Sequence, residues 1–490
     1  MQKANNLYVD SALSLRDKLQ RREITSSALL EGFVERAKTL NPKLNAIVTW
    51  DIERAEKRAS ELDELAQKNQ FVGPLHGLPI TVKDTFATAG LKTTAGSPKL
   101  AEYIPAENAV AIQRLVDAGA IIFGKTNTPT FAADLQTVNP VFGVTNNPWD
   151  VRCTCGGSSG GSAVATAMGF GAFELGSDIG GSLRTPAHFC GVYTIKPSYG
   201  LIPTGGLLST TPGNLVSRDI SCIGPFTRSA ADLSLLLDSL AGPTQPEALG
   251  WQLQLPKASK PIQQYRVAAW LDDDFCRVDS TIVSQLESTV AALTAQGVSV
   301  DRKARPDFEL ADATDIFIKL LSATSVGDLP SHAMAKRRKE LPFYSHAQQQ
   351  KLAYRSIKYS LMSVYELAQA REMQQRLRQK WQEFFQRYDV LLCPVNPSVA
   401  FPHIHSEANF FESIIINGEQ RDYGEMWVWI GALAGVAYLP AVSAPIGLSV
   451  TGLPIGIQII APYFQDHRAI DFATQLATIY GGYQPPPMAM

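Results

Sequence analysis

The sequence predicts an α/β protein, and three observations lead to that class. Between about residues 75 and 230, apolar runs of strand length alternate with Gly/Pro turns and helical stretches of small residues, which is typical of α/β folds. Apolar runs return near the C-terminus, at residues 390–392, 441–444 and 455–460. No Pro/Ser-rich linker separates the two regions, so we expect one large domain over residues 1–490.

The first 70 residues are predicted to be mainly helical. Thr25 or Ser26 is a candidate N-cap for a helix whose apolar residues recur at helical spacing and which is expected to end near Asn41-Pro42. A short apolar run at residues 46–48 then leads into a charged helix over residues 51–67. We expect residues 1–70 to form N-terminal helices that precede the core.

The segment 71–230 contains the clearest strand signals. Residues 78–82, 120–123 and 193–195 are apolar and are bounded by turn residues, as expected for buried strands. Residues 330–388 differ, because they are rich in Lys, Arg and Gln at helical spacing. A solvated helical layer is the simpler interpretation of that segment, and a lid over the substrate is the alternative.

Composition indicates a soluble globular protein of enzyme size. The chain has 490 residues, of which 45% are hydrophobic and 18% charged, as in ordinary globular proteins. Its 44 Lys and Arg nearly balance its 46 Asp and Glu, giving a net charge of −2. No overall field therefore favours nucleic acid or a membrane surface as a partner.

The six cysteines and the N-terminal segment favour the cytoplasm. The cysteines are scattered, and Cys153 and Cys155 lie too close in sequence for a routine disulfide, so we expect reduced thiols. No further Cys or His stands near this pair, and a zinc site would need about four ligands. The first 20 residues are amphipathic and charged, without the apolar core of a secretion signal or membrane anchor.

Two glycine-framed serines carry the strongest chemical signal. They lie in GGSSGGS at residues 156–162 and in DIGGSLR at residues 178–184. In the second motif, successive backbone N–H groups around Gly180 and Gly181 can surround an oxyanion beside a nucleophilic hydroxyl. Ser182 is therefore the candidate nucleophile, and it needs a neighbouring base to take its proton.

Lys83 is the candidate base. None of the seven histidines is a clear candidate for this base, since His188 lies beside apolar Phe189 and His76 precedes a Gly-Leu-Pro turn. Lys83 ends the apolar run LPITV. A lysine in an apolar or crowded site loses much of its charged form, and its neutral amine can then act as a base.

Two other motif matches suggest different chemistry. Residues 119–126 fit the phosphate-loop pattern GxxxxGK[ST], but their interior, AIIF, is a strand-like run where a phosphate cradle needs a loop. Residues 156–160 fit the nucleophile elbow GxSxG, in which Ser158 would attack with the help of a histidine such as His403 or His405. The elbow requires a preceding strand, and residues 150–155 make a poor one.

The chain resembles members of the amidase signature family, in particular the bacterial free-standing amidases with a Ser-Ser-Lys triad. The shared sequence motifs cover most of residues 72–230: GPLHGLPITVKD, GAIIFGKTN, NNPWD, GGSSGGS, GSDIGGSLRTPAHFCGVYTIKPS and GPFTRSAADL. Weaker similarity continues in YDVLLCPVNP and GLPIGIQIIAP. The resemblance implies a three-layer α/β/α domain around a mixed β-sheet that needs neither metal nor cofactor.

The resemblance also assigns roles to individual residues. Lys83 corresponds to the family's catalytic lysine, Ser158 to the bridging serine and Ser182 to the acyl-enzyme nucleophile. The peptide before the bridging serine, Gly157–Ser158, is expected in cis. The N–H groups of four residues correspond to the oxyanion hole, and four residues are expected to support the loops. The oxyanion set is Ile179, Gly180, Gly181 and Ser182, and the supporting set is Gly157, Ser159, Asp178 and Arg184.

The implied function is hydrolysis of a linear or aryl amide to a carboxylate and ammonia or an amine. A small-molecule amide is the expected partner, and a homodimer is left open. Trp427 and Trp429 are candidates for the substrate wall, although a core role is the favoured interpretation for large apolar side chains. Two positions depart from the common family pattern, because Cys155 stands where proline is frequent and Ser177 where threonine is frequent.

Two rival functions share the same fold. One is the glutamine-hydrolysing subunit of a tRNA-dependent amidotransferase, which would use an identical Ser-Ser-Lys site beside an ATP-using partner. DIGGS in place of DTGGS favours the free-standing amidases. The other is an inactive scaffold, against which the presence of all three catalytic residues argues. Fold alone does not decide among these functions.

Overall fold

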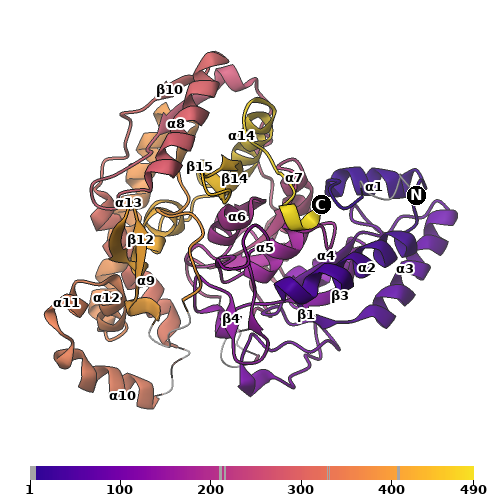
Figure 1. Ribbon diagram of the computed structural model, residues 1–490, viewed down its shortest axis with the longest axis horizontal. Helices are drawn as coiled ribbons and strands as arrows, with labels where there is room; N and C mark the ends of the chain where they lie inside the picture. Colours follow the sequence, from indigo (N-terminus) through magenta and orange to yellow (C-terminus); the bar gives the residue numbers. More distant parts are fainter. Residues whose placement is uncertain (1–6, 209–211, 214–216, 328, 330, 405–408) are drawn as a thin grey trace.

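One mixed β-sheet organises the molecule. The computed structural model describes residues 7–208, 212–213, 217–327, 329, 331–404 and 409–490, and its main sheet has 11 strands drawn from both ends of the chain (Figure 1). In sheet order these are β1 (Ile47–Trp50), β3 (Ile121–Thr126), β2 (Pro79–Lys83), β6 (Glu174–Asp178), β8 (Cys222–Thr227), β7 (Tyr193–Lys196), β14 (Ala441–Leu448), β15 (Pro454–Ile460), β11 (Val390–Pro394), β9 (Arg266–Ala269) and β10 (Ser299–Asp301). The predicted α/β class with a mixed sheet is confirmed.

The strand directions change along the sheet. β2 pairs in parallel with both β3 and β6, whereas the neighbours from β6 through β8, β7, β14 and β15 to β11 are antiparallel. β11, β9 and β10 are parallel again. Two small antiparallel sheets lie apart from the main one, formed by β4 (Val138–Asn139) with β5 (Gly143–Val144) and by β12 (Ser413–Ile416) with β13 (Glu419–Asp422).

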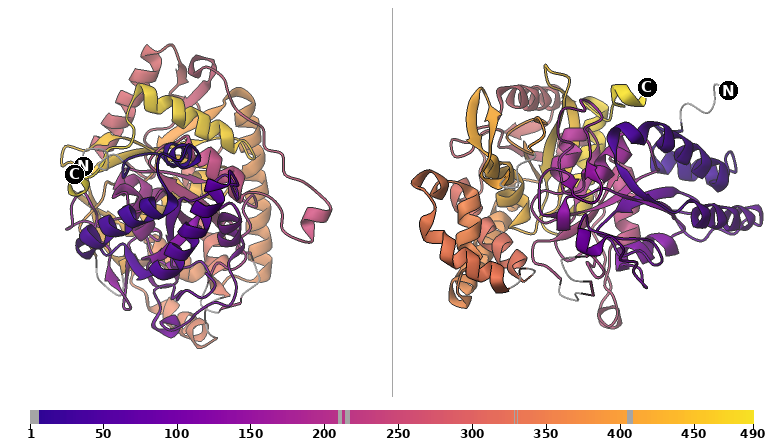
Figure 2. Two further views of the ribbon diagram at one scale, coloured as in Figure 1. Left: turned by 90° about the vertical axis from the view of Figure 1, so that its right-hand side faces the viewer. Right: turned by 60° about the horizontal axis from the view of Figure 1, so that its bottom comes forward.

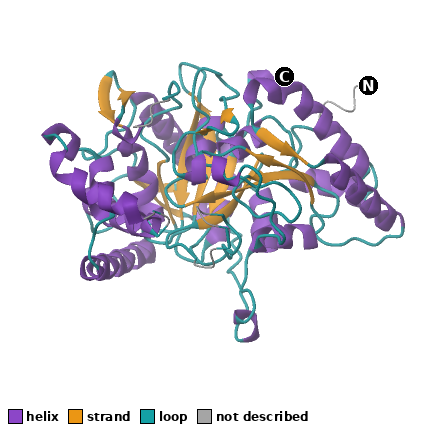
Figure 3. Ribbon diagram, turned by 90° about the horizontal axis from the view of Figure 1, so that it is seen from below, coloured by secondary structure: helices purple, strands orange, loops and turns teal. Residues whose placement is uncertain are grey.

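Helices cover the main sheet on both sides (Figures 2 and 3). Their bounds are α1 (Ala12–Gln20), α2 (Ser26–Leu44), α3 (Ile52–Gln67), α4 (Val110–Asp117), α5 (Gly160–Ala167), α6 (Arg184–Cys190), α7 (Asp232–Leu240), α8 (Ser280–Ala295), α9 (Leu310–Val326), α10 (Ser331–Glu340), α11 (His346–Gln349), α12 (Leu352–Tyr359), α13 (Val364–Arg387) and α14 (Asp466–Ile479). Strand β8 shows the layering, because Ile223 belongs to the core cluster shared with α7 and Phe226 to the one shared with α5. Successive side chains of a strand point to opposite faces, so α5 and α7 lie on opposite sides.

The N-terminal helices follow the expected order with one correction. Thr25 caps α2 by accepting a hydrogen bond from the Ala28 N–H at 3.1 Å. The helix continues to Leu44 and does not end near Asn41-Pro42. After the last turn, the Asn41 side chain accepts from the N–H groups of Ala46 and Ile47 and so holds the chain leaving the helix.

Residues 331–387 form the predicted helical layer. In α10 none of the described side chains is buried, as expected for a solvated helix rich in Lys and Arg. α13 begins with a capping box between Ser363 and Glu366 and buries Trp381 against the core. Within the described ranges, no helix combines the length and apolar character that crossing a bilayer requires.

The phosphate-loop match is a strand. Residues Ile121–Thr126 form β3 in the sheet, so no loop is present to cradle a phosphate. The Lys125 amine is fully buried and donates to the Phe86 carbonyl, to the Thr88 hydroxyl at 2.9 Å and to the Thr93 hydroxyl at 3.2 Å. Lys125 therefore fixes the loop that follows β2.

Candidate active site

Three segments far apart in sequence supply the predicted triad. Lys83 is the last residue of β2, Ser158 precedes α5, and Ser182 lies between β6 and α6. β2 and β6 are parallel neighbours, with Val82 paired to Leu175. Because the carboxyl ends of parallel neighbours lie at the same edge of a sheet, Lys83 and the loop that carries Ser182 meet there.

The Lys83 amine lies between two hydroxyl groups. Its Nζ is 2.7 Å from Ser158 Oγ and 3.0 Å from Ser177 Oγ. The side chain is fully buried, and burial lowers the pKa of Lys83 to about 7 despite the opposing effect of Asp178. A neutral amine that can accept a proton is therefore accessible near neutral pH.

Ser159 connects the three serine-bearing segments. Its N–H donates to the Ser182 carbonyl at 3.1 Å, and its hydroxyl contacts the Ser177 carbonyl at 3.2 Å and the Ser177 N–H at 3.3 Å. The peptide bond that precedes Ser158, between Gly157 and Ser158, is cis. A Cβ at Gly157 would lie 2.6 Å from the Gln136 carbonyl oxygen, so this close approach of two backbones requires glycine.

The Ser182 loop departs from one expectation. Four N–H groups were expected in the oxyanion hole, but the Gly181 N–H donates to Asp178 Oδ1 at 2.8 Å. Asp178 Oδ2 also accepts from the Leu183 N–H at 3.1 Å. Because the Gly181 N–H is bonded to the Asp178 carboxylate, it is not available to an oxyanion. The expected set of oxyanion-hole donors is therefore reduced to the N–H groups of Ile179, Gly180 and Ser182.

Asp178 and Arg184 form a fully buried ion pair that supports this loop. Arg184 Nη2 and Nε lie 2.9 and 3.0 Å from the Asp178 carboxylate, and both side chains are inaccessible to solvent. Burial alone would raise the pKa of Asp178, but the Arg184 charge and the hydrogen bonds outweigh it and lower the pKa. Arg184 Nη1 also donates to the Ile430 carbonyl at 2.6 Å and to Gln458 at 2.8 Å.

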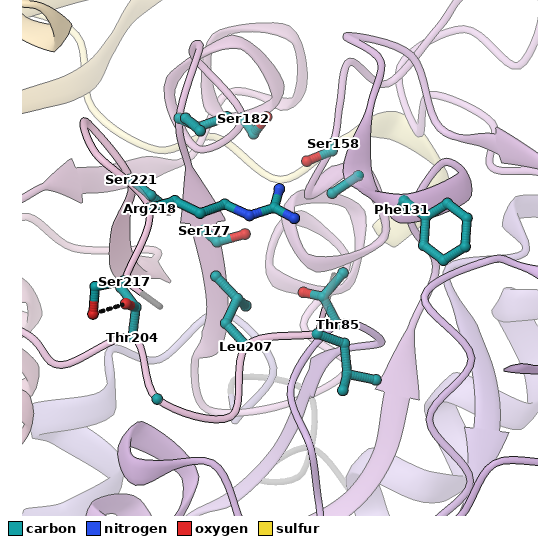
Figure 4. Close-up of a pocket in the computed structure, with 14 residues that line it drawn as sticks. Thr85, Phe131, Ser158, Ser177, Ser182, Thr204, Leu207, Ser217, Arg218 and Ser221 are labelled. Carbon is teal, nitrogen blue, oxygen red and sulfur yellow. Dashed lines mark hydrogen bonds between the residues drawn. The ribbon is translucent and has the colours of Figure 1, made fainter. Parts of the chain in front are cut away.

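A narrow cavity of about 60 Å³ opens onto the serines (Figure 4). This space accommodates only about five water molecules. Ser158, Ser177 and Ser182 line it together with two loops that sequence reasoning did not connect with the site. The other lining residues are Thr85, Phe131, Ala132, Ile179, Thr204, Gly205, Leu207, Leu208, Ser217, Arg218 and Ser221.

The two tryptophans expected in the substrate wall do not line this cavity. Trp429 is fully buried, donates from Nε1 to the Cys276 carbonyl at 3.1 Å and packs edge-on against Trp270. Trp429 is therefore a core residue, as favoured for large apolar side chains, and not part of the substrate wall. Trp427 lies closer, because a Cβ at Gly180 would be 3.3 Å from its ring, so it packs against the oxyanion loop.

No residue of 330–388 lines the cavity within the described part of the chain. The lid interpretation of those helices therefore gains no support from their position.

The nucleophile-elbow alternative does not match the geometry. Residues 150–155 form turns and isolated bridges with no strand, and the group that bonds to Ser158 is Lys83. His188 is buried between the Ser398 carbonyl and the Gly456 N–H, and burial lowers its pKa to about 4. His403 contacts the Val151 carbonyl, and His405 lies outside the described residues.

The described residues contain no group of three His, Cys, Asp or Glu side chains arranged to hold a metal ion.

A family model described as Amidase matches residues 28–470.

The chain belongs to the amidase family. It is therefore related over residues 28–470 to enzymes that hydrolyse C–N bonds, and its overall fold is similar to that of a crystal structure described as an amidase. That structure has 29% identity and a TM-score of 0.77, with 96% of this chain and 100% of the other covered.

Curated relatives of this amidase-family chain carry a more specific description, because they are named as one subunit of the glutamyl-tRNA(Gln) amidotransferase. The relative from Synechococcus sp. (strain CC9902) is 31% identical over 485 residues, covering 94% of each chain. The relative with the same name from Heliobacterium modesticaldum is 29% identical over 490 residues, covering 95% of this chain and 96% of the relative. By their names, these relatives favour the amidotransferase alternative over the free-standing amidase.

Proposed function

We propose that this chain hydrolyses small linear carboxamides through an acyl-enzyme on Ser182. The observation that carries the proposal is the 2.7 Å contact between the buried Lys83 amine and the Ser158 hydroxyl, beside a cavity that Ser182 also lines. A neutral amine in that position can take a proton through Ser158 from Ser182.

In the first half-reaction, Ser182 Oγ attacks the amide carbon while its proton passes to Ser158 and the Ser158 proton passes to Lys83. The N–H groups of Ile179, Gly180 and Ser182 are the donors that we assign to the developing oxyanion. The protonated Lys83 then returns a proton through Ser158 to the leaving nitrogen, and ammonia or an amine departs.

In the second half-reaction, water attacks the acyl carbon and gives its proton to the same relay. The relay returns this proton to Ser182, the carboxylic acid leaves and then loses its own proton to the solvent, so that no atom or charge accumulates on the protein. The cavity is narrow and Phe131 is the one aromatic side chain among its described lining residues. Both features favour a small linear acyl group over a bulky aryl group.

Trapping the acyl-enzyme tests the proposal. A serine-directed phosphonyl reagent should label Ser182 in the wild-type chain and should label neither Ser182→Ala nor heat-unfolded protein, with the site located by peptide mass spectrometry. Turnover of simple amides should disappear together with the label. Labelling of Ser158 in place of Ser182, or amide turnover by Ser182→Ala, would show that the nucleophile is wrongly assigned.

A second candidate is the glutamine-hydrolysing subunit of a tRNA-dependent amidotransferase. The descriptions of the curated relatives favour it. The discriminating measurement is ammonia release from glutamine by the isolated chain, compared with release when glutamyl-tRNA, ATP and the other amidotransferase subunits are added. Strong stimulation would establish the subunit role, and efficient turnover of simple amides without stimulation would establish the free-standing enzyme.

A further inference from the structure

We propose that the Thr85 hydroxyl binds the substrate directly, so that this chain prefers small amides that carry a second, uncharged hydrogen-bonding group such as a hydroxyl. The inference rests on the amide hydrolysis proposed above and names its substrate class. Three observations carry it: Thr85 lines the cavity that contains the catalytic serines, its hydroxyl has no partner among the described residues, and its backbone is held by a second lining loop.

Thr85 lies beside the catalytic groups. It follows the catalytic lysine by two positions and lines the cavity together with Ser158, Ser177 and Ser182. Figure 4 shows it on the same side of the cavity as Ser158, with its hydroxyl oxygen turned toward the space between Ser177 and Leu207. The exposed fraction of Thr85 is 1%, the same as that of Ser158. This degree of burial is therefore that of a group inside the reaction space, and it does not separate Thr85 from a bound amide.

The Thr85 hydroxyl differs from other hydroxyls of its loop. Within the described part of the chain, Thr85 Oγ1 is buried and has no hydrogen-bond partner. The hydroxyls of Thr88 and Thr93, farther along the same loop, contact the Lys125 amine at 2.9 and 3.2 Å. Buried hydroxyls are nearly always paired, because an unpaired one costs free energy. A partner supplied by the substrate would remove this cost only in the complex, and in that way a buried polar group selects one substrate over another.

Contacts between two loops hold Thr85 in place. The Leu208 N–H donates to the Thr85 carbonyl at 2.7 Å, and the Ala87 N–H donates to the Gly206 carbonyl at 3.0 Å. The loop after β2 is thereby paired with residues 204–208, which contribute further lining residues. Threonine is also branched at Cβ, so few orientations of its side chain are available. The hydroxyl therefore occupies a defined place in the cavity, as selection of one substrate group requires.

The chemistry of the wall indicates which substrate groups Thr85 can bind. A threonine hydroxyl donates one hydrogen bond and can accept others, so a hydroxyl, a carbonyl or an amide on the substrate can pair with it and an alkyl group cannot. Hydroxyls also line the cavity at Thr204, Ser217 and Ser221. An alkyl substituent in this space would leave the Thr85 hydroxyl unpaired in the complex as well. We therefore expect a hydroxy amide to be a better substrate than the alkyl amide of the same size.

Pairs of amides in which a terminal hydroxyl replaces a methyl group test the inference. The pairs are glycolamide with propanamide, β-hydroxypropionamide with butanamide, and γ-hydroxybutyramide with pentanamide. kcat/KM is measured for each amide in the wild type, Thr85→Val, Thr85→Ser and Thr128→Val. Thr128 is the matched control, because its hydroxyl is also buried without a partner among the described residues but lies outside the lining. We expect the wild type to prefer the hydroxy amide by about fivefold or more in at least one pair, the size of one hydrogen bond.

In Thr85→Val that preference should fall to about twofold or less, because valine has nearly the shape of threonine and lacks the hydroxyl. Turnover of the alkyl amides should stay within about twofold of the wild type, Thr85→Ser should keep the preference, and Thr128→Val should match the wild type. Thr85→Val should also melt no lower than the wild type, since the free protein loses no hydrogen bond. Phosphonyl labelling of Ser182 confirms that each variant is folded at the site.

The outcomes separate this inference from the proposed function. The role of Thr85 is refuted, and amide hydrolysis stands, if the wild type turns over the alkyl amides but prefers the hydroxy amide in no pair. It is equally refuted if the preference persists in Thr85→Val, or if that variant loses activity equally on both members of a pair. A lower melting temperature of Thr85→Val would show that the hydroxyl has a structural partner, which also refutes the role. If no amide is hydrolysed and Ser182 is not labelled, the proposed function itself fails, and this inference with it.

Discussion

The Lys83 amine and the Ser158 hydroxyl lie 2.7 Å apart although 75 positions separate them in the chain. Burial of this amine without a neighbouring counter-ion in hydrogen-bonding contact lowers its pKa to about 7. The consequence is a lysine that serves as a base near neutral pH, which makes the lysine and its two hydroxyl partners the first targets for mutation.

Lys83→Met should lower kcat/KM for any amide by a factor of about 10²–10⁴, the usual contribution of a positioned acid–base group. In the wild type, kcat/KM should rise with pH up to about 7 and then level off, because the protonated amine cannot accept a proton and its fraction falls as the pH passes the pKa. A pH–rate profile that stays flat between pH 5 and 8 would contradict the assignment of Lys83 as base.

Ser158→Ala should slow the labelling of Ser182 without abolishing it. The variant keeps the nucleophile and loses the group that connects it to Lys83, so proton transfer must run through water or not at all. The measurement is the second-order rate of phosphonylation, followed by intact-protein mass spectrometry. Ser162→Ala is the control, since Ser162 is a buried serine of α5, the helix that follows Ser158, and it contacts Thr126 and not Lys83.

Ser177→Ala should lower the pH at which the activity levels off. The Ser177 hydroxyl lies 3.0 Å from the Lys83 amine, and an acceptor there favours the protonated amine, so its removal shifts the pKa downward. We expect kcat to fall by about threefold to tenfold, the size of one lost hydrogen bond. Ser177→Thr keeps the hydroxyl and should restore the wild-type profile, and a purely structural role would leave the pKa of the profile unmoved in both variants.

Glu174→Gln should remove a loss of stability that develops between about pH 4.5 and pH 8. Glu174 is fully buried, bonded to the Thr81 hydroxyl and 3.4 Å from the Thr126 hydroxyl, and burial raises its pKa from 4.5 to about 8. Because the folded pKa exceeds the unfolded value, the folded state binds more protons between these values, so the Glu174 contribution to stability is fully present below about pH 4.5 and is lost as the pH rises to about 8.

The check for Glu174 is the melting temperature of wild type and Glu174→Gln at pH 4 and pH 9. The two proteins should melt alike at pH 4, where the acid is protonated in both the folded and the unfolded state, and the variant should melt at a higher temperature than the wild type at pH 9. Glu174→Ala should destabilise the protein by about 2–4 kcal/mol at both pH values, because it leaves a cavity and an unpaired hydroxyl. Equal differences between wild type and Glu174→Gln at both pH values would refute a protonated Glu174.

Local sequence patterns predicted the apolar strands, including β2 with Lys83, but not β6, which carries Ser177 and Asp178. β2 reads PITVK and was expected from its run of apolar residues, whereas β6 reads ELGSD and contains two acids, a glycine and a serine. This segment becomes a strand because β2 and β8 pair with it on either side, a long-range cause that propensity does not contain. Its buried acids are held by Thr81 and Arg184 from other segments.

The site was predictable where motifs define it and unpredictable where loops from different parts of the chain meet. Lys83 and Ser182 followed from their local sequence, and Ser158 from the family resemblance. Arg218 was missed because its place in the cavity depends on contacts of its neighbours with Thr204 and Arg371. The engagement of the Gly181 N–H by Asp178 was missed because a motif does not show which way a carboxylate turns.

The contacts of Arg184 show how much of the chain the catalytic loop requires. One end of this side chain holds Asp178 within the DIGGSLR motif, and the other end is bonded to Ile430 and Gln458, more than 240 positions later. A protein truncated after residue 230 would contain every triad member and still lack both anchors, leaving a buried guanidinium without its partners. The triad and its motifs therefore do not suffice for catalysis in this fold. A gene fragment that encodes them without the two C-terminal anchors would produce an inactive protein.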